Sequence, residues 1–284
     1  MASCFLEAAE KHLQARGQKD TLTAHFEYLS RTETGPAVLV VEDVKTGRQL
    51  SVLHITLYQQ GLLPHAPWIT PGTSRKEVVA YISNTDLSKE RGLSLPTGYS
   101  LESPPPPADL RALSQGRDAN WEPLKTPPGR MSYMRSLKNF QYFSPRRGQV
   151  RKSIIDLWIR LASGEGFTNT TLGYVADCWP YVVEAYRPPK PAAEGEAQSP
   201  FAFDETFWYP TVALNLEVKK ALPSKGAQWL SLRVAAKQVM NGRLDLEVII
   251  MDESGDLVAL SQHVNLIVGS ERNLSQRRQP KGQL

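Results

Sequence analysis

The sequence predicts an α+β fold in which one structural unit, a helix followed by several antiparallel strands, occurs twice. Two pairs of segments indicate this repeat. The stretch "MASCF" (1–5) matches "VADCW" (175–179) in its alanine, cysteine and aromatic residue, and differs by a serine against an aspartate. Downstream, "TLTAHFEYL" (21–29) and "TVALNLEVK" (211–219) share a threonine, a glutamate six residues later and alternating apolar positions. An internal repeat of this kind determines how the fold of the whole chain is interpreted.

The first copy begins with a helix, which we expect over residues 1–15 because apolar side chains recur there at helical spacing. Alternating apolar residues then predict four strands, and "KTG" (45–47) between two of them is a hairpin signal. The expected strands cover residues 21–33, 36–45, 47–60 and 75–84.

The second copy contains the same elements and one more. The segment "KSIIDLWIRLA" (152–162) predicts a buried strand before the helix, which we expect within "LGYVADCWPYVVEAY" (172–186). A second hairpin signal, "MNG" (240–242), lies in the strand region that follows. The expected strands cover residues 205–218, 227–239, 242–252 and 256–268. The first copy therefore lacks the strand that leads into the helix of the second.

Prolines and polar residues indicate where the two repeats, the connector between them and the tail begin and end. The N-terminal repeat covers 1–84, and a connector covers 85–135, where four consecutive prolines favour an extended surface segment. The C-terminal repeat covers 136–271, and a basic tail over 272–284 is expected to be disordered.

Composition is typical of a globular protein, with 41% hydrophobic and 22% charged residues among 284. No run approaches the roughly 18 apolar residues of a membrane span, and no signal region precedes the first helix, so we expect a cytoplasmic protein. The net charge of +4 is spread along the chain, which favours an anionic ligand without implying nucleic acid. The five histidines lack the spacing of metal ligands, so no metal or other cofactor is expected, and Cys4 and Cys178 are interpreted as reduced core residues.

Several segments resemble a known family: "LTAHFEYLSRTETGPAVLVVEDVKTGR", "SVLHITLYQ", "LGYVADCWP" and "GDLVALSQHVNLIV". The resemblance is to fungal thioesterase-like proteins related to bacterial acyl-CoA thioesterase II. It covers nearly the whole chain and implies a double hotdog fold, two helix-wrapped antiparallel sheets in tandem. In relatives, a strand and a Gly-Gly-Tyr-type turn precede the first helix, so the first copy is expected to start just after that turn.

The resemblance also implies the chemistry. Thioester hydrolysis requires an activated water and donors aimed at the developing oxyanion. In thioesterases of this type, an aspartate on the second helix, a threonine at the start of the next strand and a glutamine on the last strand hold that water. The matching positions here are Asp177, Thr211 and Gln262. Ser3, at the position that matches Asp177 in the first copy, cannot act as the base.

Each residue has a competing interpretation from its own surroundings. Gln262 belongs to an alternating set that is otherwise apolar, which predicts a buried amide with a functional role. The alternatives are that it bonds a backbone group or lies on an exposed face of the strand. Asp177 precedes Pro180 by three residues, as an N-cap would. Thr211 lies on the polar face of its strand, although Pro210 beside it allows the register to break there.

Two functions therefore remain open. The first is hydrolysis of acyl-CoA or a related thioester by Asp177, Thr211 and Gln262. The second is a non-hydrolytic hotdog protein that binds an acyl or polyketide-like ligand, or a dimer scaffold, since an exposed sheet edge would permit a homodimer. A nucleophile-elbow hydrolase is disfavoured because Gly-x-Ser-x-Gly is absent, and a hotdog dehydratase is disfavoured because Val182 occupies the histidine position five residues after Asp177.

Overall fold

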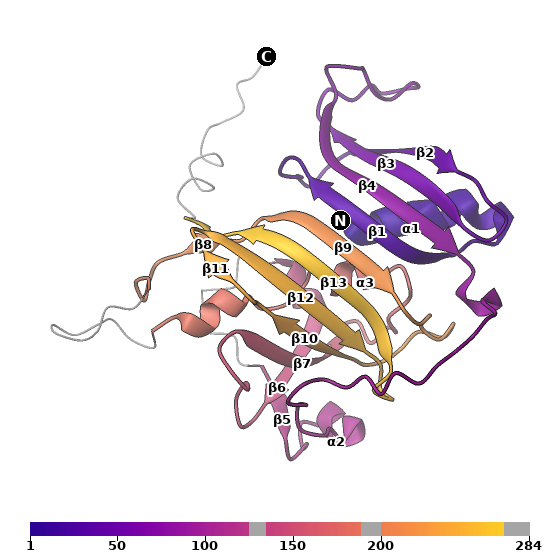
Figure 1. Cartoon of the computed structure of the whole chain (residues 1–284). Helices are drawn as coiled ribbons and strands as arrows, with labels where there is room; N and C mark the ends of the chain where they lie inside the picture. Colours follow the sequence, from indigo (N-terminus) through magenta and orange to yellow (C-terminus); the bar gives the residue numbers. More distant parts are fainter. Residues whose placement is uncertain (125–134, 189–199, 270–284) are drawn as a thin grey trace.

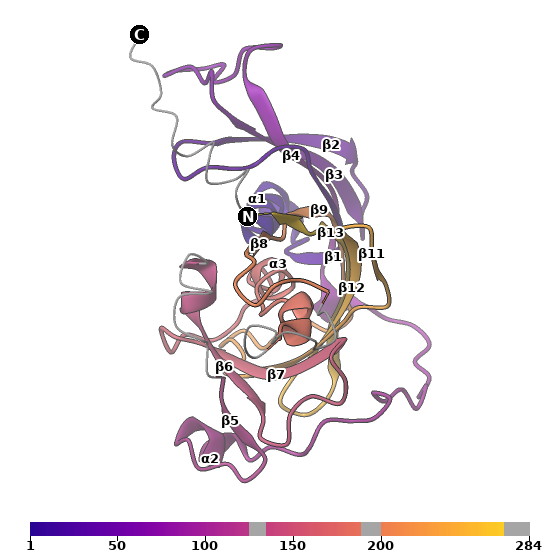
Figure 2. The ribbon, with the colours of Figure 1, turned by 90° about the vertical axis from the view of Figure 1, so that its left-hand side faces the viewer.

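One curved antiparallel sheet organises the molecule, and its strands follow the order β2-β3-β4-β1-β9-β13-β12-β10-β7-β6-β5, with β11 paired to β12. The structure is a computed structural model that describes residues 1–124, 135–188 and 200–269. Figures 1 and 2 show the sheet curling around α1 and α3, which lie on its concave side. A curved antiparallel sheet that wraps a few short helices makes this an α+β fold.

The N-terminal elements agree with the predicted ones within a few residues. The helix α1 covers Ala2–Leu13 and continues as one 3₁₀ turn, η1 (Gln14–Arg16), which Gly17 ends in the left-handed conformation. The strands are β1 (Asp20–Tyr28), β2 (Val38–Lys45), β3 (Ser51–Gln59) and β4 (Arg75–Thr85). The strand β2 lies at the edge of the sheet in the described part of the chain.

The five predicted C-terminal strands are present in the predicted order, together with shorter strands that were not predicted. The leading strand is β7 (Ile154–Leu161), and it pairs with β10 (Leu230–Ala235). The others are β9 (Thr211–Val218), β12 (Arg243–Met251) and β13 (Leu257–Leu266). The short strands β8 (Phe207–Trp208) and β14 (Val268–Gly269) form a separate ladder, and β11 is Val239–Met240.

The connector is more structured than the sequence indicates. It contains η2 (Leu87–Lys89), the short helix α2 (Leu110–Ser114) and β5 (Trp121–Pro123), while residues 125–134 lie outside the described part. The turn η3 (Arg135–Asn139) and strand β6 (Phe140–Pro145) follow. Trp121 is buried against Leu113, Phe143 and Trp229, so the connector has a small core of its own. The predicted tail over 272–284 also lies outside the described residues.

The prediction of one helix within residues 172–186 is wrong. The chain forms a single α-helical turn, α3 (Leu172–Val175), and then a 3₁₀ segment, η4 (Val182–Tyr186). Pro180 explains the break, because it lacks an amide donor and also disfavours helical backbone at the residue before it. Asp177 therefore caps no helix, and it lies in the irregular stretch between the two elements.

The two helices begin against each other. A Cβ at Gly173 would lie 2.9 Å from the backbone nitrogen of Ser3, so only glycine permits this approach of α3 to the first turn of α1. Phe5 of α1 is fully buried and packs edge-on against Phe26 of β1, with ring centroids 5.5 Å apart. The start of α1 thus lies beside the stretch that holds Asp177.

The two cysteines differ in their exposure. Cys178 is buried as predicted, whereas Cys4 is exposed on the outer side of α1, and both are free thiols. Within the described ranges, no helix is long and apolar enough to cross a membrane.

Candidate active site

Asp177 and Thr211 meet as predicted. The Thr211 hydroxyl donates a hydrogen bond of 3.0 Å to Oδ1 of Asp177. Thr211 is the first residue of β9, where the register with β13 shifts between Val264 and Asn265. This irregularity turns Thr211 away from the exposed face that the strict alternation of β9 predicted for it.

Asn265 is a third member of this chain of hydrogen bonds. Its side-chain nitrogen donates to the Thr211 hydroxyl over 3.1 Å, and its residue is only 1% exposed. Because the hydroxyl of Thr211 accepts from Asn265, its own proton is directed at Asp177. Successive hydrogen bonds of this kind polarise one another, which strengthens the donation to the carboxylate.

His263 faces the same carboxylate. Its Nδ1 lies 3.7 Å from Oδ1 of Asp177, and its side chain is completely buried. Its Nε2 contacts the Ser261 hydroxyl over 2.9 Å, and that hydroxyl donates its only proton to the backbone carbonyl of Asn215 over 2.6 Å. Nε2 must therefore be the protonated nitrogen, since Ser261 can only accept from it.

The neutral imidazole of His263 consequently presents the lone pair of Nδ1 toward Asp177. Burial lowers the pKa of His263 to about 3, so the ring stays neutral at physiological pH. No described residue makes a hydrogen bond of ordinary geometry with Nδ1, and the nearby backbone of Ala176 only partly opposes the fall of the pKa. Two acceptors, one nitrogen and one carboxylate oxygen, thus face each other at a separation too long for a direct hydrogen bond.

Gln262 is not where the sequence placed it. Its side chain is exposed, on the face of β13 opposite to His263 and Asn265. The predicted alternation fails because the pairing of β12 with β13 shifts between Ile250 and Met251, so that both Val258 and Ala259 are buried and the phase changes. Beyond the shift, the inward positions are polar: Ser261, His263 and Asn265.

Packing fixes the irregular stretch around Asp177. The Trp179 indole donates to the carbonyl of Ala176 over 2.8 Å, and its ring lies edge-on to that of His263, with centroids 5.9 Å apart. The side chain of Trp179 therefore contacts both the backbone before Asp177 and the ring of His263.

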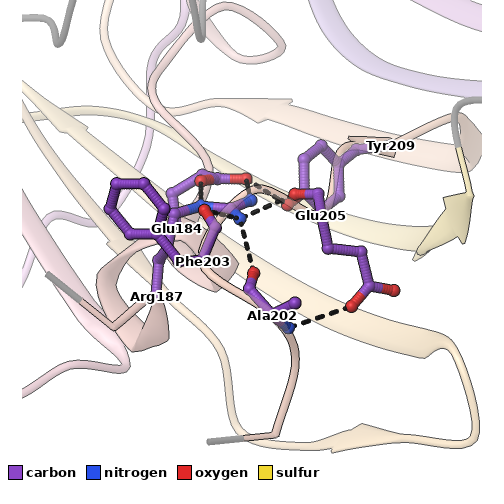
Figure 3. Close-up of polar contacts among 6 residues, drawn as sticks. All are labelled: Glu184, Arg187, Ala202, Phe203, Glu205 and Tyr209. Atoms are coloured by element: carbon purple, nitrogen blue, oxygen red, sulfur yellow. Dashed lines mark hydrogen bonds and ion pairs between the residues drawn. The ribbon is translucent and has the colours of Figure 1, made fainter. Parts of the chain in front are cut away.

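A second set of contacts anchors the chain before Thr211. Figure 3 shows Arg187 in a two-pronged contact with Glu184, with distances of 2.6 and 2.9 Å, while the Tyr209 hydroxyl donates to the same carboxylate over 2.6 Å. Arg187 also donates to three backbone carbonyls, those of Ala202, Phe203 and Glu205. Tyr209 stacks on Tyr181 at 4.1 Å. These hydrogen bonds and ring contacts hold the segment leading into β9 against the segment that follows Asp177.

The carboxylate of Asp177 is suited to act as a base. Its side chain is 35% exposed, so solvent reaches it from one side. Burial by the surrounding protein raises the pKa of Asp177 from 3.8 to about 6, while the hydrogen bond from Thr211 opposes this rise. A carboxyl group with such a pKa is ionised at neutral pH and is far more basic than an ordinary aspartate.

Sequence reasoning missed His263 and Asn265. Their trace in the sequence is the alternating polar set of "SQHVN" (261–265), in which Ser261, His263 and Asn265 occupy one face of a strand. The described residues contain no cluster of histidine, cysteine and acidic side chains that could hold a metal ion.

Comparison with known proteins identifies the family of the chain. Residues 1–84 match the family of acyl-CoA thioesterase N-terminal domains, and residues 105–267 match the family of acyl-CoA thioesterase C-terminal domains. The thioesterase-like protein TwmA of Talaromyces wortmannii is 43% identical over 294 residues, covering 97% of this chain and 84% of TwmA.

Solved structures show the same fold. A candidate thioesterase II from Thermobifida fusca superposes with a TM-score of 0.63 at 18% identity, covering 94% of this chain and 86% of that one. A hotdog-fold protein of unknown function from Alicyclobacillus acidocaldarius gives a TM-score of 0.61 at 14% identity, with 92% and 86% covered. The two family matches span most of the chain and its fungal relative spans nearly all of it, so the chain belongs to the acyl-CoA thioesterase family, whose members are thioester hydrolases.

Proposed function

We propose that the protein hydrolyses acyl-CoA or a related thioester, with Asp177 as the general base, Thr211 as the group that orients it and His263 as its partner in holding the water. The observation that carries this proposal is the hydrogen bond of 3.0 Å from Thr211 to Asp177. It joins two residues 34 positions apart that the family resemblance selects independently of any geometry.

The water would lie between Asp177 and His263. Both groups are acceptors, so one water can donate one hydrogen to Nδ1 of His263 and the other to the carboxylate. This leaves a lone pair on the water oxygen free to attack. In the attack, a bond forms from that oxygen to the thioester carbon, and the water proton passes to Asp177. The carbon–sulfur bond then breaks, and the thiolate takes the proton, which yields a carboxylic acid and a thiol.

The proposed third residue differs from the predicted one. His263 takes the place expected for Gln262, because its side chain faces Asp177 while that of Gln262 is exposed. A neutral imidazole with its lone pair toward the water can only accept a hydrogen bond from it, whereas a glutamine amide can also donate. In this protein the water is therefore oriented by two acceptors.

The architecture we propose is a double hotdog, with one repeat over 1–84 and the other over 136–271, separated by the connector 85–135. Its support is that β2-β3-β4-β1 and β10-β12-β13-β9 run in the same order from the two sides of the sheet. The halves join through β1 and β9, where His25 pairs with Asn215. These two residues hold the same place in the two copies, as expected at a pseudo-two-fold axis.

The corresponding site in the first half would be degenerate. Thr21 pairs with Asn84 and donates to its side chain over 3.2 Å, as the counterpart of the Thr211–Asn265 pair. Ser3 and Ile82 occupy the places of Asp177 and His263, so that half has neither a base nor an imidazole. One hydrolytic site per chain follows from this.

Release of free thiol from acyl-CoA substrates of varied chain length tests the proposal, with a thiol-reactive chromogenic reagent as the readout. Wild type should release thiol. In Asp177→Asn the rate should be about 10²- to 10⁴-fold lower, which is the range that general-base catalysis contributes. Asp86→Asn is the matched control, because it changes a distant carboxylate. Binding of acyl-CoA without thiol release at any chain length would instead support the non-hydrolytic, ligand-binding function.

A further inference from the structure

The Tyr28 hydroxyl is buried and has no hydrogen-bond partner among the described residues. Other tyrosines near the second copy are bonded: Tyr142 donates to the carbonyl of Cys178 over 2.9 Å, Tyr174 to that of Ser136, and Tyr209 to Glu184. A buried hydroxyl without a partner costs about 1–3 kcal/mol, so a protein rarely retains one that has no use.

The pairing of β1 with β9 determines where this hydroxyl lies. Ala24, Phe26 and Tyr28 alternate on the core side of β1, and the last pair of the ladder is Glu27 with Ala213. Tyr28 therefore continues the ladder opposite Val212, the neighbour of Thr211. Its ring stacks on Phe26, with centroids 6.3 Å apart, which fixes the direction of the phenol.

Electrostatics agrees with this position. Burial raises the pKa of Tyr28 well above its ordinary value, and the charge of Asp177 raises it further. The hydroxyl is thus within electrostatic reach of the proposed base, and it keeps its proton at every physiological pH. It is therefore a permanent hydrogen-bond donor.

Several unpartnered polar atoms belong to residues of the elements that meet at the candidate site. Six buried side-chain atoms lack a hydrogen-bond partner in the described part of the chain, and four of them belong to Ser3, Tyr28, His263 and Asn265. His263 faces Asp177, Asn265 binds Thr211, and Ser3 lies at the end of α1 that contacts α3. His263 and Asn265 present acceptors, so Tyr28 and Ser3 are the hydroxyl donors of the group.

We propose that the Tyr28 hydroxyl donates a hydrogen bond to the carbonyl oxygen of the bound thioester and stabilises the oxyanion that forms there. This deepens the proposed function and rests on it. The first half of the chain would supply the electrophilic group and the second half the base and the water site, so neither half would be active alone. A donor that is already desolvated and oriented stabilises such an oxyanion without reorganisation during the reaction.

Tyr28→Phe tests the proposal, with Tyr81→Phe as the matched control because Tyr81 is 53% exposed on the other side of the sheet. Loss of one oxyanion donor typically lowers kcat about 10²- to 10³-fold, so we expect a fall of that size in Tyr28→Phe with little change in KM. The melting temperature should not fall, because no protein partner is lost. A structural role would instead lower stability and leave kcat of the remaining folded protein unchanged.

A second readout does not depend on hydrolysis. The probe is an acyl-CoA ketone in which a methylene group replaces the thioester sulfur, and the measurement is the infrared stretching frequency of its isotopically labelled carbonyl. A hydrogen bond from Tyr28 should lower this frequency on binding to wild type and Tyr81→Phe, and the shift should be lost in Tyr28→Phe. An unchanged shift in Tyr28→Phe, or its loss in Ser3→Ala alone, would overturn the proposal.

The two failures can be told apart. Absence of thiol release by wild type would contradict the proposed hydrolysis, while the carbonyl frequency would still report whether Tyr28 binds an acyl carbonyl. Full kcat in Tyr28→Phe alongside an active wild type would contradict the role of Tyr28 and leave Asp177, Thr211 and His263 in place.

Discussion

Replacing Asp177 by asparagine should stabilise the folded protein at neutral pH while it removes most of the hydrolytic rate. The pKa of Asp177 is raised from 3.8 to about 6, mainly by burial. The folded state therefore disfavours the charged form, so wild type loses stability as pH rises from about 3.8 to about 6 and the loss is constant above that. Asparagine has the same shape, accepts from Thr211 in the same way and carries no charge.

The size of the effect follows from the two pKa values. The difference between 3.8 and about 6 corresponds to about 3 kcal/mol. Because the side chain is 35% exposed, solvent screens part of this, and we expect a gain of about 1–2 kcal/mol at pH 8. For a protein of this size that raises the melting temperature by about 3–5 °C.

Thermal unfolding of wild type and Asp177→Asn at pH 8 and pH 5 measures this gain. At pH 5 the wild-type carboxyl is largely protonated in the folded state, so the gain should be about half as large. Asp86→Asn is the control of opposite sign, because a hydrogen bond from Lys89 lowers the pKa of Asp86 to about 2. An Asp177→Asn variant that is less stable than wild type at pH 8, or whose gain is the same at both pH values, would refute this account of Asp177.

Three further substitutions separate the roles of the site residues. Thr211→Val removes the hydroxyl at similar volume and leaves Asn265 without its acceptor. The rate of thiol release should fall at least about tenfold, and the free energy of unfolding in urea should fall by about 1–2 kcal/mol. Full activity would exclude Thr211 from the site. The buried, neutral His263 has a pKa lowered to about 3, so its contribution to wild-type stability should fall by about 2 kcal/mol between pH 7 and pH 5, as the unfolded chain takes up a proton. His263→Gln should lack this contribution, so its stability should fall less than that of wild type over this range; identical acid sensitivity would contradict the assignment. Gln262→Ala should retain the wild-type rate of thiol release because Gln262 is exposed, and a large loss would restore the residue that the sequence predicted.

The elements that were predicted correctly are those whose residues obey one periodicity throughout. The α1 pattern of Phe5, Ala9 and Leu13 is unbroken, and all three side chains are buried. Along β9, burial alternates from Leu214 to Val218, as the sequence predicted. Composition and periodicity are sufficient there because burial alone decides the structure.

The errors occur where backbone geometry changes the phase. Pro180 reduces a predicted helix to one turn, α3, and a 3₁₀ segment, and no apolar period records that break. A shift of one residue in the pairing of β13 exposes Gln262 and turns His263 inward, with Val264 and Leu266 left exposed despite being apolar. The identity of the third site residue depends on this shift, which sequence alternation cannot reveal. Asp177 and Thr211 were predicted from residue type and family position, and the structure joins their side chains by a hydrogen bond.

The pH dependence of kcat/KM for thiol release tests most directly whether Asp177 is the base. The raised pKa of about 6 predicts that kcat/KM increases tenfold per pH unit below that value and levels off above it, since only the ionised carboxylate can accept the water proton. In Asp177→Asn the residual rate should lack this dependence. A wild-type profile that is flat from pH 5 to pH 8, or an inflection near pH 6 that persists in Asp177→Asn, would contradict the assignment of Asp177 as the catalytic base.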